Sequence, residues 1–233
     1  MIYVMSDLHG AYEKYKAMLQ KINFNENDIL YILGDVIDRG EDSLKILLDM
    51  MNYDNIYPIL GNHELMALEV LPQLMKEVTD EHIDLYMNDN FMQAYVDWTL
   101  NGGNQTLNEF KNLSSNERQA VLEYLEDFLP YDAIDVNDRT FLLVHAGLNN
   151  YQPGKKLHEY SLTELTFMRP DYEKQYFNDD SIYIVCGHTP TLLISGKAEI
   201  YHSHNNICID CGATFKKGRL ACLCLDTLEE FYV

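Results

Sequence analysis

The stretch GDVIDRGEDS, residues 34–43, follows an apolar run, DILYIL (residues 28–33), that is typical of a buried β-strand. Two carboxylates, Asp35 and Asp38, and one guanidinium, Arg39, are therefore crowded at the point where the strand ends. Charged groups in such a place need partners of opposite charge or a ligand. The pattern favours an α/β fold with a site at the end of its sheet.

Short apolar runs and helical patterns alternate along the first 60 residues. Apolar residues recur at helical spacing in AYEKYKAMLQKI and SLKILLDMM, whereas IYVM and IYPIL are short continuous apolar runs. This alternation is typical of a parallel sheet with helices packed on it. The elements expected here are strands at 2–5, 28–33 and 56–60 and helices at 11–22 and 43–51.

The character of the chain changes between residues 64 and 130. Two long helical patterns, residues 81–100 and 114–129, are separated by NGGNQT, residues 101–106, which we expect to break the helices. With no repeat or low-complexity linker, we expect one domain, residues 1–233, with a helical insertion at roughly 64–130. Strand patterns then return at 133–136, 140–145, 181–188, 206–213 and 219–226, with a final edge strand at 231–233.

The composition excludes some classes of partner. The 17 basic and 37 acidic residues give a net charge of −20, which would repel a polyanion, so we expect no nucleic-acid partner. No apolar run approaches the roughly 20 residues of a membrane span, so we expect no membrane partner either. Polar residues begin within the first ten positions, which leaves no room for a cleaved signal segment. The sequence therefore predicts a cytoplasmic protein and leaves its oligomeric state open.

Five cysteines raise the question of a structural zinc site. The pairs in CIDC and CLC resemble metal knuckles, but Cys222 and Cys224 are separated by a single residue in an apolar run. Zinc knuckles usually place two or more residues between ligands. Buried reduced thiols are therefore favoured over zinc for Cys186, Cys208, Cys211, Cys222 and Cys224.

Further groups with ligand chemistry follow the other expected strands. Taken singly, each has a structural explanation, as a helix cap, a turn or a hydrogen-bonded histidine. Their recurrence directly after several strands, beside glycines, is harder to explain by structure alone. The candidates are Asp7 and His9 in SDLHG, Asn62 and His63 in GNHE, His145 in HAG, His188 in GHTP and, from a loop, Arg169 in MRP.

These residue types have a common chemistry. Aspartate and histidine suit divalent ions such as manganese, iron or zinc, and a carboxylate can bridge two of them. Two cations about 3.5–4 Å apart clamp phosphate oxygens and lower the pKa of a water molecule from about 15.7 towards 7. Arginine matches phosphate oxygens with paired hydrogen bonds. The sequence therefore indicates a metal pair that acts on a phosphoryl group.

In this order, DLHG, GDVIDRG, GNHE, HAG and GHTP resemble the motifs of the calcineurin-like metallophosphoesterases. The arginine of GDVIDRG and the glutamate of GNHE resemble the phosphoprotein phosphatase branch, whose bacterial and phage members include lambda-phosphatase-like enzymes. The resemblance runs from Asp7 to about Phe215, and it implies a β-sandwich flanked by helices, the αββα fold. Cys211 departs from the threonine that such bacterial members often have in DTGA.

The resemblance also implies a role for each candidate residue. One metal is expected to be held by Asp7, His9 and Asp35, and the other by Asp35, Asn62, His145 and His188, with Asp35 bridging. The cofactors would be two divalent ions, with manganese favoured over iron or zinc. His63, oriented by Asp38, resembles the general acid that protonates the leaving oxygen, and Arg39 and Arg169 resemble clamps for the phosphate.

Three functions remain open at this point. The leading expectation is a phosphomonoesterase that hydrolyses phosphoserine, phosphothreonine or similar monoesters by attack of a hydroxide that bridges the two metals. A symmetrical dinucleoside tetraphosphate hydrolase shares these motifs. A non-catalytic metal- or thiol-dependent regulatory protein is disfavoured, because the sequence keeps both the expected acid, His63, and the expected clamp, Arg39.

A few conspicuous residues are expected to lie outside the metal site. His202 and His204 fall on one face of an expected strand, and an exposed edge is favoured over metal binding. Trp98 is expected to belong mainly to the core. Glu64 is expected to support the ligands or to pack beside them.

Overall fold

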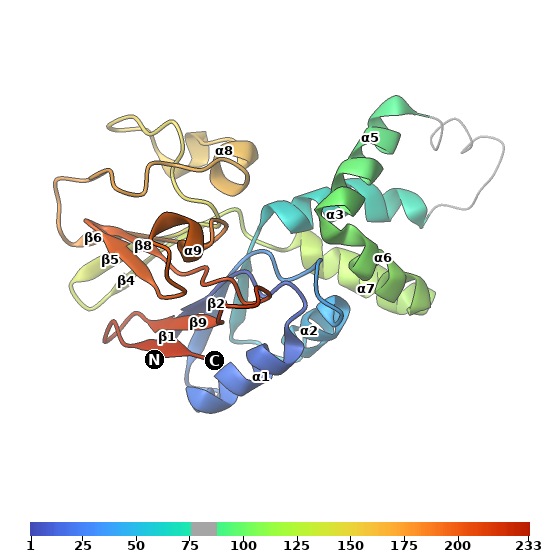
Figure 1. Cartoon of the computed structure of the whole chain (residues 1–233), viewed down its shortest axis with the longest axis horizontal. Helices are drawn as coiled ribbons and strands as arrows, with labels where there is room; N and C mark the ends of the chain where they lie inside the picture. The colour runs from blue at the N-terminus through green and yellow to red at the C-terminus, as the bar shows by residue number, and fades with distance from the viewer. Residues whose placement is uncertain (76–87) are drawn as a thin grey trace.

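Two five-stranded β-sheets lie face to face in the computed structural model, which describes residues 1–75 and 88–233. Helices cover the outer face of the first sheet, and long loops with short helices cover the outer face of the second (Figure 1). The αββα fold expected from the sequence is therefore confirmed. Both termini lie beside the first sheet, where β1 and β9 are neighbours (Figure 1).

The first sheet has the strand order β10-β9-β1-β2-β3. β1, β2 and β3 pair in parallel, as the alternation of strands and helices predicted, and α1 and α2 connect them. β9 and β10 come from the end of the chain and run antiparallel to their neighbours. The bounds are β1 Ile2–Met5, α1 Tyr12–Lys21, β2 Ile29–Leu33, α2 Ser43–Met50, β3 Ile56–Ile59, β9 Ala221–Cys224 and β10 Glu230–Tyr232.

The second sheet has the order β4-β5-β6-β8-β7. β5, β6 and β8 are parallel, and antiparallel strands β4 and β7 form its two edges. Between β5 and β6 the chain makes a long excursion that the sequence patterns did not predict. The bounds are β4 Asp132–Val136, β5 Arg139–Leu143, η2 Leu157–Glu159, α8 Leu162–Thr166, β6 Ile182–Cys186, α9 Thr191–Ile194, β7 Tyr201–Ser203 and β8 Asn206–Cys208.

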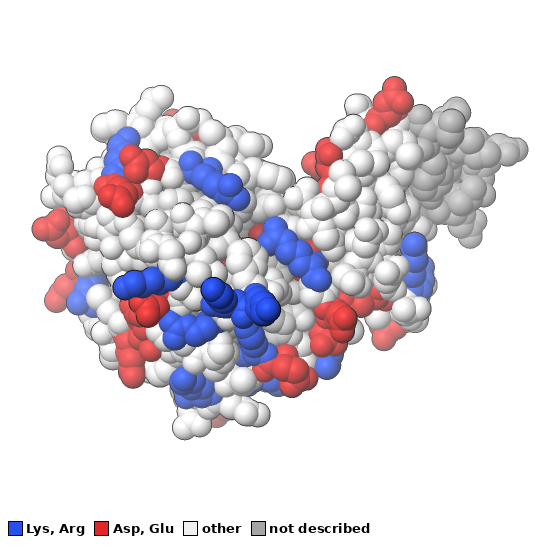
Figure 2. Space-filling view, viewed as in Figure 1, with Lys and Arg blue, Asp and Glu red and all other residues white. Residues whose placement is uncertain are grey.

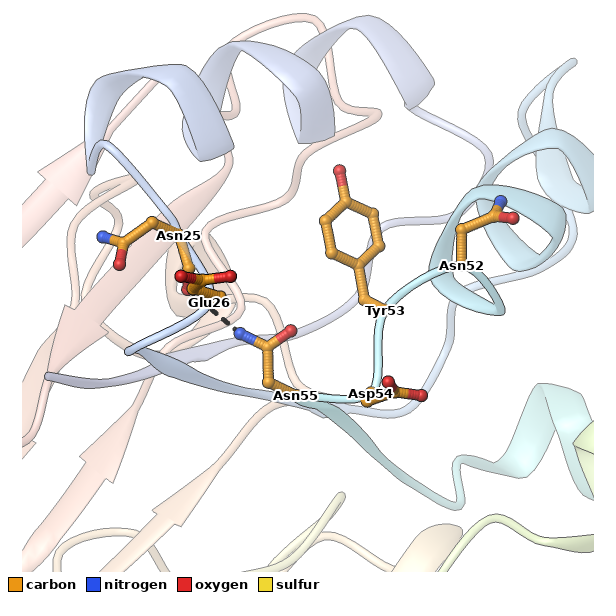
Figure 3. A pocket seen from close by; sticks show the side chains of 6 residues that line it. All are labelled: Asn25, Glu26, Asn52, Tyr53, Asp54 and Asn55. Carbon is orange, nitrogen blue, oxygen red and sulfur yellow. Dashed lines mark hydrogen bonds between the residues drawn. The ribbon is translucent and has the colours of Figure 1, made fainter.

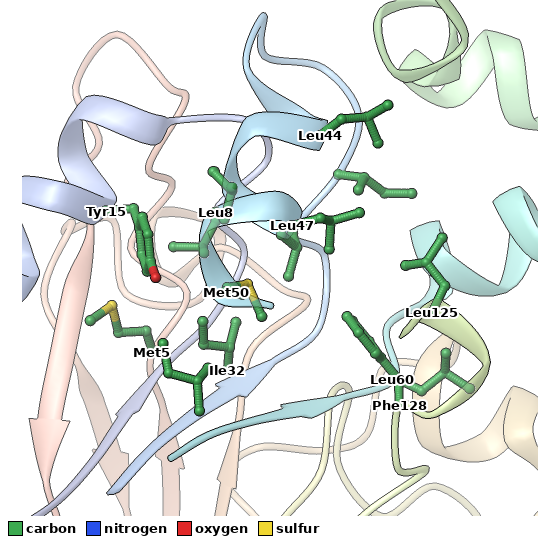
Figure 4. Packing of buried hydrophobic residues seen from close by; sticks show 14 of the residues in the cluster. Met5, Leu8, Tyr15, Ile32, Leu44, Leu47, Met50, Leu60, Leu125 and Phe128 are labelled. Atoms are coloured by element: carbon green, nitrogen blue, oxygen red, sulfur yellow. The ribbon is translucent and has the colours of Figure 1, made fainter. Parts of the chain in front are cut away.

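Three layers of buried apolar side chains hold these elements together. Val4, Leu33 and Phe141 belong to the layer between the two sheets. The layer between the first sheet and its helices is drawn in Figure 4, where Met5 and Ile32 of the strands face Leu47 of α2. A third layer, which includes Ile184 and Cys186, lies between the second sheet and the excursion after β5. The carboxyl ends of the parallel strands are thereby fixed relative to one another.

The helical segment after β3 forms a lobe beside the sheets (Figure 1). Part of the helix expected at 81–100 lies outside the described residues, and its described part is α5. The expected break at NGGNQT is confirmed at Gly102, whose φ of 110° is non-helical and kinks the chain, but the residues from Asn104 onward already belong to α6. The bounds are α3 Asn62–Leu74, α5 Asp89–Trp98, η1 Thr99–Gly103, α6 Asn104–Asn112 and α7 Ser115–Glu126.

Within the described part of the chain, no helix combines the length and the apolar character needed to cross a bilayer.

Candidate active site

The loops that follow β1, β2, β3, β5 and β6 meet at one edge of the paired sheets and bring most of the expected ligands together. Asp35, directly after β2, lies at the centre and is 2% exposed. Its two carboxylate oxygens face two different groups of side chains. The site is best described as these two groups.

His145 lies at the centre of the first group. Its Nε2 atom is 3.1 Å from Asn62 Oδ1, 3.2 Å from His188 Nδ1 and 3.3 Å from Asp35 Oδ1. The ligand atoms of Asp35, His145 and His188 all lie within 4.8 Å of one another. The structure thus brings together the four side chains expected to hold one of the metals.

Backbone carbonyls fix which ring nitrogen faces this group. A carbonyl oxygen can only accept a hydrogen bond, so the nitrogen beside it carries the proton. His145 Nδ1 is 2.6 Å from Leu33 O, and His188 Nε2 is 3.1 Å from Phe167 O. The other nitrogen of each ring presents a lone pair, as do the amide and carboxylate oxygens beside it. Lone pairs that converge in this way are stabilised by a proton or a cation between them, and this set of donor atoms fits a divalent metal.

The electrostatics of the group agree with this fit. Burial opposes ionisation of Asp35, but the imidazoles of His145, His63 and His9 hold its pKa well below the ordinary value. Burial also opposes a charge on His145, yet Asp35 raises the pKa of that ring to about 10. Burial lowers the pKa of His188 to about 3, which keeps it a neutral ligand. The arrangement requires one positive charge beside Asp35, from a proton or from a bound cation.

The second group forms around the other oxygen of Asp35. Asp35 Oδ2 is 3.6 Å from His9 Nε2 and 3.9 Å from His63 Nε2. His9 Nδ1 donates to Ile37 O at 2.9 Å, and burial lowers the pKa of His9 to about 3, so its Nε2 presents a lone pair. Arg39 lies between the rings, with Nη1 2.7 Å from His9 Nε2 and Nη2 2.9 Å from His63 Nε2. Because Asp35 belongs to both groups, it is placed to bridge two cations.

Asp7 lies beside these groups, in contact with the loop that carries His188. Its Oδ2 atom accepts the backbone N–H of His188 at 2.9 Å. Gly187 leaves the space for this contact, since a Cβ there would lie 2.1 Å from Asp7 Oδ2. Burial raises the pKa of Asp7 well above the ordinary value, and the nearby carboxylate of Asp210 adds to the effect. The described cluster around His9 contains His63 where the resemblance places Asp7.

His63 and Asp38 form a buried pair, with His63 Nδ1 2.7 Å from Asp38 Oδ2. Two donors from the helical lobe hold the carboxylate in place: Trp98 Nε1 at 2.8 Å and Thr106 Oγ1 at 2.6 Å. Burial opposes a charge on His63, but Asp35 and Asp38 raise its pKa above the ordinary value. Trp98 is buried, as expected, but it also fixes the partner of the expected acid, which the sequence patterns did not reveal.

The backbone around the site is held in an unusual conformation. The left-handed region costs a non-glycine residue on the order of 1–2 kcal/mol, so the surrounding contacts must enforce it. Glu64 supplies such contacts, because its carboxylate accepts the N–H groups of Asp35, Val36 and Gly61 at 2.8–3.1 Å. Glu64 therefore supports the ligands, as expected. The site residues with positive φ are Asp7, His9, Asp35, Asp38, Arg39 and His188.

Asp210 is a buried acid near the site that the sequence patterns did not single out. It follows β8 in IDCGATF, and its Oδ1 atom accepts the N–H of Gly212 at 2.8 Å. Burial raises its pKa to about 6, against the effect of that hydrogen bond. Its position directly after a strand is the sequence signal for it.

The other conspicuous side chains lie away from the two groups. All five cysteines are buried free thiols, as expected, and Cys186 Sγ lies 3.8 Å from Cys208 Sγ. Among the described residues, no cysteine belongs to a cluster with metal-ligand geometry. His202 is half-exposed and its Nε2 is 2.7 Å from Glu230 Oε1, so it does not join the site.

A cavity of about 510 Å³ opens onto the two groups. Asn62 and His188 line it from the metal side, and Arg39 and Arg169 contribute guanidinium groups. Met66 and Asn101 come from the helical lobe, and Phe167 comes from the segment after α8. Figure 2 shows a notch between the lobe and the rest of the molecule, with a Lys or Arg side chain at its lower end. The structure therefore places both expected phosphate clamps in the cavity above the ligands.

A second hollow, of about 410 Å³, lies at the opposite ends of the parallel strands (Figure 3). Its amide groups serve the local turns, since Asn55 Nδ2 donates to the carbonyls of Asn25 and Asp28 at 3.0 and 2.7 Å. The ring of Tyr53 lies beside these amides in Figure 3. None of the proposed ligands lines this hollow.

The chain belongs to the calcineurin-like phosphoesterase family, whose sequence profile matches residues 1–213. Curated relatives carry a more specific name, bis(5'-nucleosyl)-tetraphosphatase, symmetrical. The one from Wigglesworthia glossinidia brevipalpis is 38% identical over 98 residues, and the one from Chromobacterium violaceum is 33% identical over 99 residues. Each match covers 41–42% of this chain and 36% of the relative, so it spans about a third of the relatives' length.

Solved structures share the fold over most of the chain. A candidate diadenosine tetraphosphatase has a TM-score of 0.67 at 18% identity, with 100% of this chain and 92% of that one covered. A protein serine/threonine phosphatase from Saccharomyces cerevisiae has a TM-score of 0.58 at 15% identity, with 89% and 65% covered. These similarities support the αββα architecture and do not distinguish between substrates.

Proposed function

We propose that the protein is a two-metal hydrolase that cleaves symmetrical dinucleoside tetraphosphates at the central anhydride. One water molecule is consumed and two nucleoside diphosphates are formed. The names of the curated relatives favour this reaction over the phosphomonoesterase first expected from the motifs. The observation that carries the proposal is the bridging position of Asp35 between two sets of converging lone pairs, below a cavity with two arginines.

The donor set assigns the metal ligands. We propose that Asp35, Asn62, His145 and His188 hold one divalent ion and that Asp7, His9 and Asp35 hold the other, with manganese favoured. Bound there, the two ions would act as Lewis acids on the phosphoryl oxygens and lower the pKa of the attacking water. Glu64 is not assigned as a ligand, because both of its carboxylate oxygens accept hydrogen bonds from backbone N–H groups.

The remaining side chains bind the polyphosphate and move a proton. Arg39 and Arg169 line the cavity and can each donate paired hydrogen bonds to oxygens of the phosphoryl group. His63 Nε2 lies 2.9 Å from Nη2 of Arg39, which lines the cavity, while its Nδ1 is held by Asp38. A protonated His63 can therefore give its Nε2 proton to the leaving oxygen. We propose that helices α3, α5, α6 and α7 and the two sheets act as one catalytic unit, because Met66 and Asn101 of the lobe complete the cavity.

The second candidate is a phosphomonoesterase of the phosphoprotein phosphatase branch. The buried Asp38–His63 pair favours it, because an alkoxide is a poor leaving group and needs a proton, whereas a phosphate leaves more easily. The leaving group therefore separates the two candidates.

The test compares substrates on the purified protein with manganese. We expect diadenosine tetraphosphate to be cleaved to ADP alone, with a kcat/KM at least about tenfold above that for a phosphoserine peptide. Chromatography of the products separates ADP from the AMP and ATP of asymmetric cleavage. A higher kcat/KM for the phosphopeptide would instead support the monoesterase, and AMP plus ATP would contradict symmetrical cleavage.

A further inference from the structure

The active-site cavity continues into a groove along the excursion between β5 and β6. The cavity that opens onto the ligands shares Arg169 with a second cavity of about 320 Å³. This second cavity shares Tyr151, Lys174 and Tyr176 with a third cavity, of about 590 Å³. The shared lining residues make the three cavities neighbours in a row. We call this row of three cavities the groove.

Two cations along this groove have no carboxylate partner. Neither Arg169 nor Lys174 forms an ion pair or side-chain hydrogen bond with residues 1–75 or 88–233, although acidic residues outnumber basic ones by 37 to 17. Both side chains are exposed. Unpaired cations in so acidic a protein are available to an anionic ligand.

Aromatic rings position Lys174 at the junction of the second and third cavities. Its Nζ atom lies 5.3 Å from the ring centroids of both Tyr151 and Tyr176, within the range of a cation–π contact. Tyr176 is buried and its hydroxyl donates to Asp171 O at 3.0 Å, so this ring is fixed. The lysine is therefore held over the groove with its three N–H donors available to a ligand.

The far end of the groove has a different character. Phe177 and Pro153 line the third cavity with apolar surface, together with the amide side chains of Gln175 and Asn178. The ring of Phe177 is held edge-on by Tyr151, with 5.8 Å between the centroids. Aromatic surface beside amide groups suits a nucleobase, which has a π-face and hydrogen-bonding edges.

Carboxylates also line the groove, and they are occupied locally. Asp171 Oδ1 accepts the N–H of Glu173 at 3.0 Å, and Asp179 Oδ1 accepts the N–H and hydroxyl of Ser181 at 2.9 and 2.6 Å. The groove is thus not uniformly basic. Its unpaired cations lie between the metal groups and the apolar end. Half a dinucleoside polyphosphate has a matching arrangement, with negative phosphates next to the scissile bond and an uncharged nucleoside beyond them.

We propose that this groove binds one nucleoside diphosphate half of the substrate, with Arg169 on the phosphate next to the scissile bond, Lys174 on the following phosphate and the nucleoside in the third cavity. The proposal rests on the function proposed above and names the subsite that would select a dinucleotide. A simple monoester would leave the groove beyond Arg169 empty. Lys174 is then a specificity-determining residue.

The test measures discrimination between substrates. Lys174→Met keeps the aliphatic stem and removes the charge, and Lys111→Met is the matched control, because Lys111 is an exposed lysine of α6 that lines none of the three cavities. For each variant, kcat/KM is measured for diadenosine tetraphosphate and for p-nitrophenyl phosphate. We expect Lys174→Met to lower the ratio of kcat/KM for diadenosine tetraphosphate to kcat/KM for p-nitrophenyl phosphate about tenfold, as for one lost charge-assisted contact. Lys111→Met should leave this ratio within twofold of the wild-type value.

A binding measurement separates this subsite from the proposed reaction. ADP should inhibit hydrolysis of p-nitrophenyl phosphate, with an inhibition constant about tenfold higher in Lys174→Met, whereas inhibition by inorganic phosphate should change less than twofold. If the wild type cleaves the dinucleotide but Lys174→Met matches Lys111→Met in both assays, the groove proposal is wrong and the proposed function stands. If the dinucleotide is not cleaved but ADP inhibition still depends on Lys174, the groove stands and the proposed function is wrong.

Discussion

Asp35 is the residue on which both candidate metal positions depend. Its Oδ1 atom faces His145 at 3.3 Å and its Oδ2 atom faces His9 at 3.6 Å. The N–H of His63 also donates to Oδ1, at 3.2 Å, which helps to set the orientation of the carboxylate. An amide side chain has the same shape but only one oxygen and no charge.

We therefore expect Asp35→Asn to weaken both metal sites together. An amide cannot present two anionic oxygens to two cations, so the purified variant should hold fewer than two manganese ions per chain and lose at least about 10³-fold in kcat. Circular dichroism should show an unchanged fold, because the apolar strands are untouched. Asp49→Asn on α2, an aspartate paired with Lys16, is the matched control and should keep both metals. Two tightly bound ions in Asp35→Asn with near-native turnover would contradict the bridging assignment.

His63 makes a different prediction, which depends on the leaving group. His63→Asn should keep both metals and slow the hydrolysis of an alkyl phosphate by about 10²–10⁴-fold, as expected for a lost general acid. Hydrolysis of p-nitrophenyl phosphate should be slowed much less, because that phenolate leaves without a proton. The control is His202→Asn, a half-exposed histidine paired with Glu230. Equal losses on the two substrates would remove His63 from the acid role.

At the scale of elements, helices α5 and α6 of the lobe both contact one carboxylate of the site, Asp38. Trp98, at the end of α5, and Thr106, in α6, both donate to Asp38, which lies 60 or more residues earlier in the chain. Gly103 permits the bend between these helices, since a Cβ there would lie 2.5 Å from the Trp98 ring. The packing of the lobe can therefore affect His63 through Asp38, which the two donors hold in place.

We expect Trp98→Phe to reduce kcat through this contact. A phenyl ring replaces the indole and the N–H is lost, so Asp38 loses one of its donors, an effect of about 1 kcal/mol or roughly fivefold. The loss should appear in kcat and not in KM, and it should be larger for an alkyl phosphate than for p-nitrophenyl phosphate. In the His63→Asn background the substitution should have almost no further effect on kcat. A loss that is independent of the leaving group, or additive with His63→Asn, would mean that Trp98 acts only through folding.

These elements also show what the sequence could and could not predict. The three strands β1 to β3 and the ligands after them could be predicted, because the spacing of apolar residues and the position of a ligand directly after a strand can both be read from neighbouring residues. The contact between Trp98 and Asp38 could not, because it depends on where a helix far along the chain packs. The same holds for the groove at Lys174, which lies in an excursion with no periodic pattern. Asp210 is different, because it directly follows a strand and a local pattern is enough to predict it.

At the scale of the whole molecule, the protein is acidic, and several buried carboxyl side chains lie together at the site. Four of these carboxyl side chains are at most 4% exposed and are close enough to affect one another's pKa: Asp7, Asp35, Glu64 and Asp210. Burial raises the pKa of Glu64 to about 7 and that of Asp210 to about 6, since carboxylates in this environment oppose one another's charge. Cations bound among them would relieve this repulsion.

Divalent metal should therefore stabilise the fold as well as support activity. At 100 times its dissociation constant, one bound ion adds about 2.7 kcal/mol to the free energy of unfolding, or about 5–10 °C in Tm for a chain of this size. We expect manganese to raise the Tm of the chelator-treated protein by at least this amount and to restore turnover. Asp35→Asn should show a much smaller rise.

Because the five thiols are buried and outside both groups, brief alkylation of the native holoprotein should leave its turnover and its Tm unchanged. Inactivation by alkylation without loss of metal, or a wild-type Tm indifferent to manganese, would show that the acidic site is not organised around cations.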